Sequence, residues 1–280
     1  ILAEYAKLDA RVHYSRSPEF LKHADNVNRA VELCDTTWIR LFCHDDIMLP
    51  GCLNTTVRVI NDSADERVAL IGDAPGWLFG NGFRYTAYQN EESPPYRWDG
   101  RDFMRRKLRG QRVDPLPALT TATVRRAAFD SSPKFINKFM HFDVFLWSEM
   151  LVDWDYLFIP HMLTLTRIHG VQVQVDARKT LATVTDNQAF WPDYYERHRD
   201  VLQLTSRERH RIRLKPISIA GTIVAIQLIK GNVKAAAKLF TRFPVWWYPM
   251  LIVSISWALH REYSKVAALR TKVPVDLIYP

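Results

Sequence analysis

Short apolar runs alternate with segments of helical period along the first two thirds of the chain. The segment 26–34 places Val27, Ala30 and Val31 on one helical face, whereas 38–42 has the length of a buried strand. The expected strands are 11–14, 38–42, 68–72, 119–124, 156–159 and 163–168. The expected helices are 26–34, 53–60, 101–108 and 143–151. This alternation predicts an α/β layered domain. Residues 76–97, rich in Gly, Pro and aromatic residues, are expected to form a long loop.

Basic residues gather in the C-terminal part of the chain. Residues 1–204 hold 25 Lys and Arg against 27 Asp and Glu, whereas 205–272 hold 13 against 2, so this region accounts for the net charge of +8. We expect one domain over 1–204 and a basic, aromatic-rich helical region over 205–280. Such a region can face nucleic acid, anionic lipid or an acidic partner. We expect no nucleic-acid partner, because no nucleic-acid-binding module is recognisable.

The apolar stretch 244–259 in that region contains Trp246, Trp247 and Tyr248. It is shorter than the roughly 20 residues of a transmembrane helix. Aromatic rings favour the membrane interface, so the stretch indicates an interfacial or partner-docking element. An ordinary packed helix and a membrane span are the alternatives.

Cysteine usage and the first residues bear on the cellular setting. Cys34, Cys43 and Cys52 are odd in number and form no CxxC pair, which argues against a disulfide framework and a cysteine zinc site and favours a reducing compartment. The chain starts at Ile1 without a signal-peptide pattern. We expect its true N-terminus to lie upstream.

The segment WIRLFCHDDIMLP ends an apolar strand in two adjacent carboxylates, Asp45 and Asp46. Open α/β sheets bind ligands at the carboxyl ends of their strands. Two carboxylates can hold Mg²⁺ or Mn²⁺ while the phosphates of a substrate complete the coordination shell. Taken alone, the pair also fits a cap for the helix expected after Pro50. The order of the surrounding segments favours the metal site.

Several segments follow one another as in family 2 glycosyltransferases of the GT-A fold, which residues 8–175 resemble. These segments are Asn26–Ala30, Trp38–Phe42, Cys43–Asp46 with Pro50, Val124–Phe129, Phe142–Trp147 and Leu165–His169. The resemblance implies a GT-A-like (Rossmann-like) mixed sheet flanked by helices, followed here by the basic helical region. The strand–helix–strand unit with which the family opens and contacts the nucleotide base has no counterpart before residue 8.

The resemblance also implies roles for single residues. Asp143 corresponds to the general base of an inverting transfer, although Phe142 replaces the acidic residue before it. Asp45, Asp46 and His169 are implied ligands of Mn²⁺ or Mg²⁺, although Cys43 stands where the family pattern has its first Asp. The residues implied to contact the nucleotide sugar are Asn28, Arg29, His44 and Arg167. Those implied on the acceptor side are Trp77, Arg125 and Trp147, although Trp77 and the other aromatic residues of 76–97 could equally pack beneath a loop.

The expected partners are a nucleotide-diphosphate sugar, a saccharide or lipid-linked acceptor, and an anionic membrane surface that meets 205–272. A cytoplasmic protein, peripheral at the inner face of the membrane and acting in cell-surface polysaccharide synthesis, fits these partners. One alternative is a non-catalytic membrane-surface or partner-binding protein with a degenerate GT-A-like body. Another is a metal-dependent hydrolase that uses the His and Asp residues.

Overall fold

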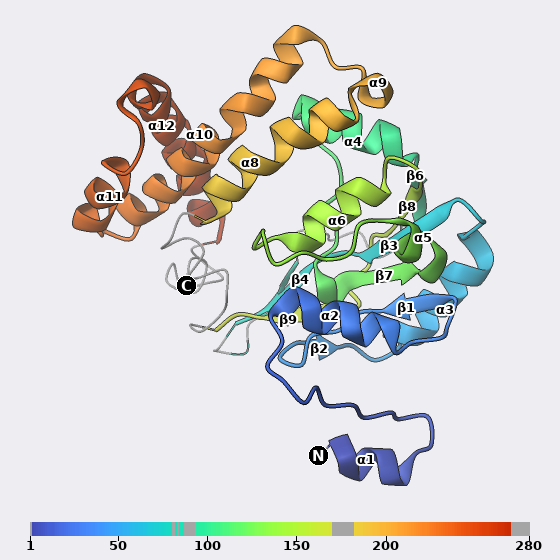
Figure 1. Ribbon diagram of the computed structural model, residues 1–280. Coiled ribbons are helices and arrows are strands. Elements are labelled where there is room, and N and C mark those ends of the chain that lie inside the picture. Colours follow the sequence, from blue (N-terminus) through green and yellow to red (C-terminus); the bar gives the residue numbers. More distant parts are fainter. Residues whose placement is uncertain (1, 80–81, 83, 87–92, 170–181, 270–280) are drawn as a thin grey trace.

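A mixed five-stranded sheet forms the centre of the protein. The computed structural model describes residues 2–79, 82, 84–86, 93–169 and 182–269 (Figure 1). The sheet has the order β1-β7-β3-β8-β6, with β3 parallel to β8 and the other neighbours antiparallel. Its strands are β1 (Trp38–Arg40), β7 (Ala122–Arg125), β3 (Val68–Asp73), β8 (Asp155–Ile159) and β6 (Tyr96–Trp98). Because β7 runs against both β1 and β3, the strands β1, β3 and β8 share one direction.

Alternating side chains of the central strands serve two apolar cores. Leu157 and Ile159 of β8 pack with residues of α3 (Cys52–Ser63), whereas Tyr156 and Phe158 face the larger core on the other side. The larger core also takes up buried residues of α2 (His23–Glu32), α4 (Gly100–Arg109), α5 (Arg126–Ser131) and α6 (Phe142–Met150). The expected fold class, a mixed sheet flanked by helices, is confirmed.

A second, four-stranded sheet lies beside the first. Its order is β2-β9-β4-β5, with β2 (Ile47–Met48), β9 (Thr164–Arg167), β4 (Gly76–Leu78) and β5 (Arg84–Thr86). The expected long loop over 76–97 was therefore wrong, because its aromatic residues supply β4, β5 and β6. Trp77 pairs with Tyr85 across β4 and β5 and with Thr166 across β4 and β9.

Two further expectations need correction. Residues 11–14 form no strand; they follow α1 (Leu2–Leu8), which has no buried residue, and are largely exposed themselves. The expected strand 119–124 begins instead as a 3-10 turn, η1 (Leu119–Thr121). Thr121 closes this turn with bonds from its amide and hydroxyl to the carbonyl of Ala118.

Helices make up the described C-terminal part of the chain (Figure 1). They are α8 (Ala182–Arg197), α9 (Arg199–Leu202), α10 (Ser206–Ile229), α11 (Val233–Phe240), η2 (Val245–Trp247) and α12 (Tyr248–Leu269). Thr205 and Glu208 form a capping box at the start of α10. Helix α10 packs against α8, α11 and α12 and also contacts α4. It has the length and apolar composition of a membrane span, but half of its most apolar stretch is buried against the rest of the protein.

Candidate active site

The acidic turn, residues Cys43–Asp46, lies where β1 ends and the chain crosses to the second sheet. The amide of Leu41 donates to the carbonyl of Ala122 at 3.0 Å. The amide of Asp46 donates to the carbonyl of Cys43 at 3.3 Å, and this bond closes the turn. Strand β2 then pairs with β9. Because β1 runs parallel to β3 and β8, the turn lies at the carboxyl edge of the central sheet, where α/β folds bind ligands.

Asp46 is held by groups from two other elements. The hydroxyl of Thr120 donates to one carboxylate oxygen, and the amide of Arg167 donates to the other at 2.9 Å. The same Thr120 oxygen accepts the amide of Cys43 at 3.1 Å. Burial raises the pKa of Asp46 despite these bonds, and the charge of Asp45 adds to the effect. Asp46 is therefore fixed in place by η1 and by β9.

Asp45 points to His169, with 3.1 Å between Oδ2 and Nε2. Each of these two side chains is about one third exposed. Burial opposes ionisation of Asp45, but the bond with His169 and the nearby His44 outweigh it, so the pKa of Asp45 lies below its ordinary value. The pairing expected between Asp45 and His169 is thus present in the structure, with Asp45 ionised and accessible.

The donor atoms of the turn suit a hard or borderline divalent cation. Ligand atoms of Cys43, Asp45 and Asp46 all lie within 4.8 Å of one another. Burial raises the pKa of the Cys43 thiol, and all three neighbouring carboxylates, Asp46, Asp45 and Asp143, act in the same direction. A thiol that keeps its proton is a poor ligand. Carboxylate oxygens with an imidazole nitrogen nearby fit Mn²⁺, and the oxygens alone fit Mg²⁺.

A buried ion pair below the turn had no signal in the sequence. Nη2 of Arg40 lies 2.6 Å from Oδ1 of Asp73, with the two side chains 9% and 0% exposed. The Arg40 guanidinium also donates to the carbonyl of Thr120 at 3.1 Å, and Thr164 donates to Asp73 at 2.9 Å. The pair therefore supports Thr120, the residue that holds Asp46 and Cys43.

Asp143 lies in the first turn of α6, close enough to Cys43 for its charge to act on the thiol. Its Oδ1 accepts the amide of Val144 at 2.8 Å. Burial raises the pKa of Asp143, whereas the amides of Val144 and Leu119 and the charge of His141 oppose this. Asp143 is thus a desolvated carboxylate beside the acidic turn, with a higher basicity than an ordinary aspartate.

The residues expected to contact the nucleotide sugar lie in different settings. His44 is exposed within the acidic turn, and Arg167 is exposed at the end of β9. Asn28 instead joins α2 to Phe135. Its side chain donates a hydrogen bond to the backbone carbonyl of Phe135 at 2.8 Å and accepts one from the backbone amide of Phe135 at 3.1 Å. Arg29 donates to the hydroxyl of Ser15. The structure brings His44 and Arg167 to the turn and gives Asn28 a role in packing.

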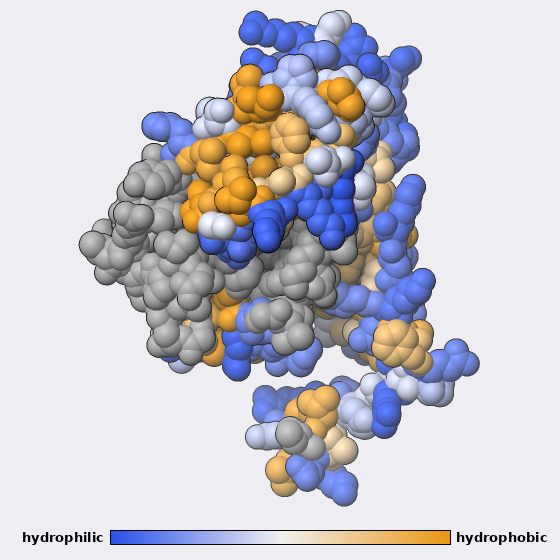
Figure 2. Space-filling model, turned by 90° about the vertical axis from the view of Figure 1, so that its left-hand side faces the viewer, coloured by the Kyte–Doolittle hydropathy of each residue, from blue (hydrophilic) through white to orange (hydrophobic). Residues whose placement is uncertain are grey.

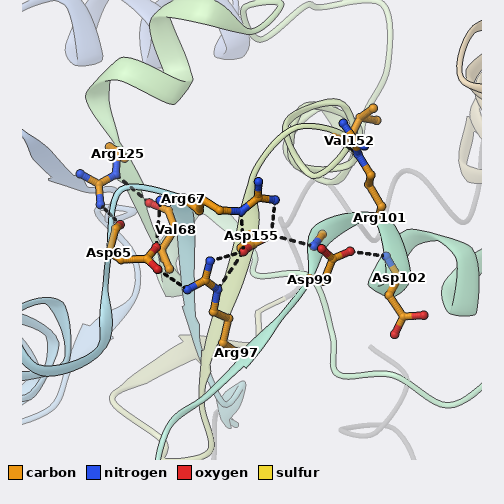
Figure 3. Close-up of polar contacts among 11 residues, drawn as sticks. Asp65, Arg67, Val68, Arg97, Asp99, Arg101, Asp102, Arg125, Val152 and Asp155 are labelled. Carbon is orange, nitrogen blue, oxygen red and sulfur yellow. Dashed lines mark hydrogen bonds and ion pairs between the residues drawn. The ribbon is translucent and has the colours of Figure 1, made fainter. Parts of the chain in front are cut away.

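Two of the residues expected on the acceptor side lie elsewhere. Trp147 is fully buried and donates to the carbonyl of Pro117 at 3.0 Å, so it is a core residue. Arg125 ends β7 at the opposite edge of the sheet, because β7 runs against β1. There it donates to the carbonyls of Val68 and Asp65 (Figure 3).

Around Arg125, polar contacts close this far edge of the sheet. Asp155 accepts bonds from the guanidinium groups of Arg67 and Arg97 (Figure 3). It also accepts a bond from the amide of Gly100. The guanidinium of Arg125 also lies 4.4 Å from the ring centre of Trp38. These contacts hold the strand ends together, so Arg125 has a structural role at this edge of the sheet, away from the acidic turn. Trp77, the third residue expected on the acceptor side, is half-buried and lines a pocket beside β4.

Comparison with known proteins agrees with this geometry. Among curated proteins, no significant match is found. Residues 1–132 match the family described as Glycosyl transferase family 2. The match covers the acidic turn and the strands β1, β3 and β7, whereas Asp143 and His169 lie beyond it. Residues 1–132 are thus similar to glycosyl transferase family 2.

Proposed function

We propose that the protein transfers a sugar, with inversion, from a nucleotide-diphosphate sugar to an acceptor hydroxyl, using Asp143 as general base and a divalent cation at the acidic turn. One observation carries the proposal. Ligand atoms of Cys43, Asp45 and Asp46 lie within 4.8 Å of one another, and the Asp143 carboxylate is close enough to the Cys43 thiol for its charge to act on it, which supports a shared site for the candidate base and the candidate metal ligands.

In the proposed reaction, one oxygen of Asp143 accepts the proton of the acceptor hydroxyl. The hydroxyl oxygen forms a bond to the anomeric carbon while the bond from that carbon to the diphosphate oxygen breaks. The diphosphate leaves with the electron pair of the broken bond. A general base works best when its pKa approaches the working pH, so the raised pKa of Asp143 favours this role.

Asp45, Asp46 and His169 are the proposed ligands of the cation, which offsets the charge on the departing diphosphate when bound. The amide of Arg167 and the hydroxyl of Thr120 keep Asp46 oriented. The bond with His169 lowers the pKa of Asp45 and so favours its ionised form. These contacts hold two carboxylates in place without using all of their oxygen lone pairs, which leaves ligand capacity for the cation.

Asp143→Asn tests the base. We expect binding of Mn²⁺ and a nucleoside diphosphate to persist, while sugar transfer, screened over a panel of nucleotide-diphosphate sugars and acceptors, falls by about 10²-fold or more. Asp153→Asn is the matched control, because Asp153 follows α6 but is 73% exposed. Transfer that survives in Asp143→Asn would place the base elsewhere.

The wild type also distinguishes the alternative functions. Phosphoester hydrolysis without transfer would favour a hydrolase, and nucleotide binding without turnover would favour a non-catalytic protein with a degenerate GT-A-like body.

We also propose that the C-terminal helices rest on an anionic membrane surface, as a peripheral protein at the inner face of the membrane would. The supporting observation is an exposed apolar face over α11, η2 and α12 (Figure 2). Val245, Trp246 and Val253 are 70%, 79% and 69% exposed. The exposed basic residues Lys234 and Lys238 lie on α11. Aromatic and basic side chains together suit the headgroup region.

Co-sedimentation with vesicles of phosphatidylcholine, with and without phosphatidylserine, tests this surface. We expect binding that requires phosphatidylserine, decreases with salt and is weakened in Trp246→Ala. Phe20→Ala is the matched control, because Phe20 is 95% exposed but precedes α2, outside the C-terminal helices. Equal binding by the two variants, or none by the wild type, would contradict the proposal.

A further inference from the structure

A pocket of about 470 Å³ lies between α4, the segment 111–115, β4 and α10. Its walls thus come from β4 of the second sheet, from α4 and from the C-terminal helix α10, which contacts α4. Its lining includes Trp77 and Val113 as apolar surface. The volume falls within the range of about 300–1,000 Å³ typical of small-molecule sites.

Three cationic side chains line the pocket against one carboxylate. The cations are Lys107 of α4, Arg112 of the connecting segment and Lys215 of α10, and the carboxylate is Asp114. Asp114 already accepts bonds from the Tyr96 hydroxyl at 2.6 Å and the Trp98 indole at 2.8 Å. Within the described part of the chain, no carboxylate lies at ion-pair distance from Lys107 or Lys215. Among the described residues that line the pocket, cationic side chains therefore outnumber carboxylates by three to one.

Both lysines are half-buried. Burial lowers the pKa of Lys215 to about 7, and the charge of Lys107 acts in the same direction. Burial likewise lowers the pKa of Lys107. The ring of Trp191 on α8, 4.3 Å from Nζ of Lys215, gives a cation–π contact but no charge compensation. An anion bound in the pocket that these two lysines line would stabilise their charged forms.

We propose that this pocket binds the phosphate group of an organic phosphate through Lys107, Arg112 and Lys215. A multiply charged oxyanion matches three cationic side chains that line one pocket, and Arg112 can offer a bidentate fork while the lysines act as point charges. The space beyond a phosphate group lies against Trp77 and Val113, which suits a carbon skeleton. This site shares no residue with the acidic turn, whose proposed ligands are Asp45, Asp46 and His169.

Inorganic pyrophosphate is the probe, titrated calorimetrically into the full chain in EDTA so that no divalent cation can hold it at the acidic turn. We expect measurable binding by the wild type and a Kd about tenfold or more weaker in Lys215→Met and in Lys107→Met, because each loses a charge-assisted contact. Lys215→Arg, which keeps the charge, should retain binding. Lys7→Met on the exposed helix α1 is the matched control.

A second arm distinguishes a soluble phosphate from a lipid phosphate. Vesicles of phosphatidylcholine, with and without phosphatidic acid, replace pyrophosphate, and the same variants are compared by co-sedimentation. Binding that depends on Lys215 and Lys107 in either arm supports the site, and the arm in which it occurs shows whether the ligand is a soluble or a lipid phosphate. Equal binding by Lys215→Met, Lys107→Met and Lys7→Met in both arms, or no binding by the wild type in either, would overturn the proposal. Thermal melting of each variant verifies that it is folded.

Discussion

Removing the guanidinium of Arg40 should destabilise the protein strongly. In Arg40→Met, Asp73 loses a partner 2.6 Å away while remaining fully buried. The carbonyl of Thr120 and the hydroxyl of Thr123 each lose a donor as well, at 3.1 Å and 3.2 Å. Breaking one side of a buried ion pair costs about 3–5 kcal/mol, a large share of the roughly 5–15 kcal/mol that stabilises a typical protein.

Urea unfolding followed by circular dichroism measures this loss of free energy. Arg58→Met is the control, because Arg58 is exposed on α3 and its removal should change stability by about 0.5 kcal/mol or less. The double variant Arg40→Met, Asp73→Asn should lose less stability than the sum of its single variants, because the neutral amide that replaces the Asp73 carboxylate needs no counter-charge and its oxygen can still accept the bond from Thr164. A loss below about 1 kcal/mol in Arg40→Met, the value of an exposed pair, or strict additivity in the double variant would refute the reasoning.

Three further predictions follow from single contacts. Thr120→Val removes the hydroxyl that holds Asp46 and the amide of Cys43, so Mn²⁺ affinity, measured by electron paramagnetic resonance, should fall about 10–100-fold; unchanged affinity would contradict the positioning role. Lys215 has a folded-state pKa of about 7 against about 10.4 when unfolded, so the folded protein binds fewer protons between these values and its stability rises with pH across that window. Lys215→Met lacks this term and should therefore melt above the wild type at pH 7, by a margin that shrinks towards pH 10; a constant margin would argue against a desolvated ammonium. Trp147→Phe should lower the free energy of unfolding by about 1–3 kcal/mol, because the Pro117 carbonyl loses its buried donor, and a fall in acceptor affinity without loss of stability would restore Trp147 to the acceptor side.

The elements predicted correctly are those whose own residues carry the signal. The apolar run at 68–72 is β3, buried at every position, and the helical faces of 53–60 and 143–151 became α3 and α6 with small shifts at their ends. Residues 11–14 resemble a strand but have no neighbouring strand to bond, so they remain irregular. The Gly and Pro residues of 76–97 concealed three short strands, of which β4 pairs with β9 and β6 with β8, both far away in the sequence.

In the candidate site too, contacts between residues far apart in the sequence were the ones that the sequence did not reveal. Asp45 and Asp46 were visible as neighbours in the sequence, and the resemblance supplied Asp143 and His169. Arg40 and Asp73, in contrast, look like ordinary strand residues in the sequence. Their ion pair depends on the strand order β1-β7-β3, which no local pattern reveals. Strand direction also explains the misplacement of Arg125, since β7 points away from the acidic turn.

The proposed metal centre is tested most directly by binding of Mn²⁺ in the presence of a nucleoside diphosphate, followed by electron paramagnetic resonance. Asp45→Asn is compared with Asp200→Asn, a carboxylate of α9 that is 95% exposed. We predict that the wild type and Asp200→Asn bind the ion and that Asp45→Asn does not. Equal binding by the two variants would contradict the assignment of the acidic turn as the metal centre.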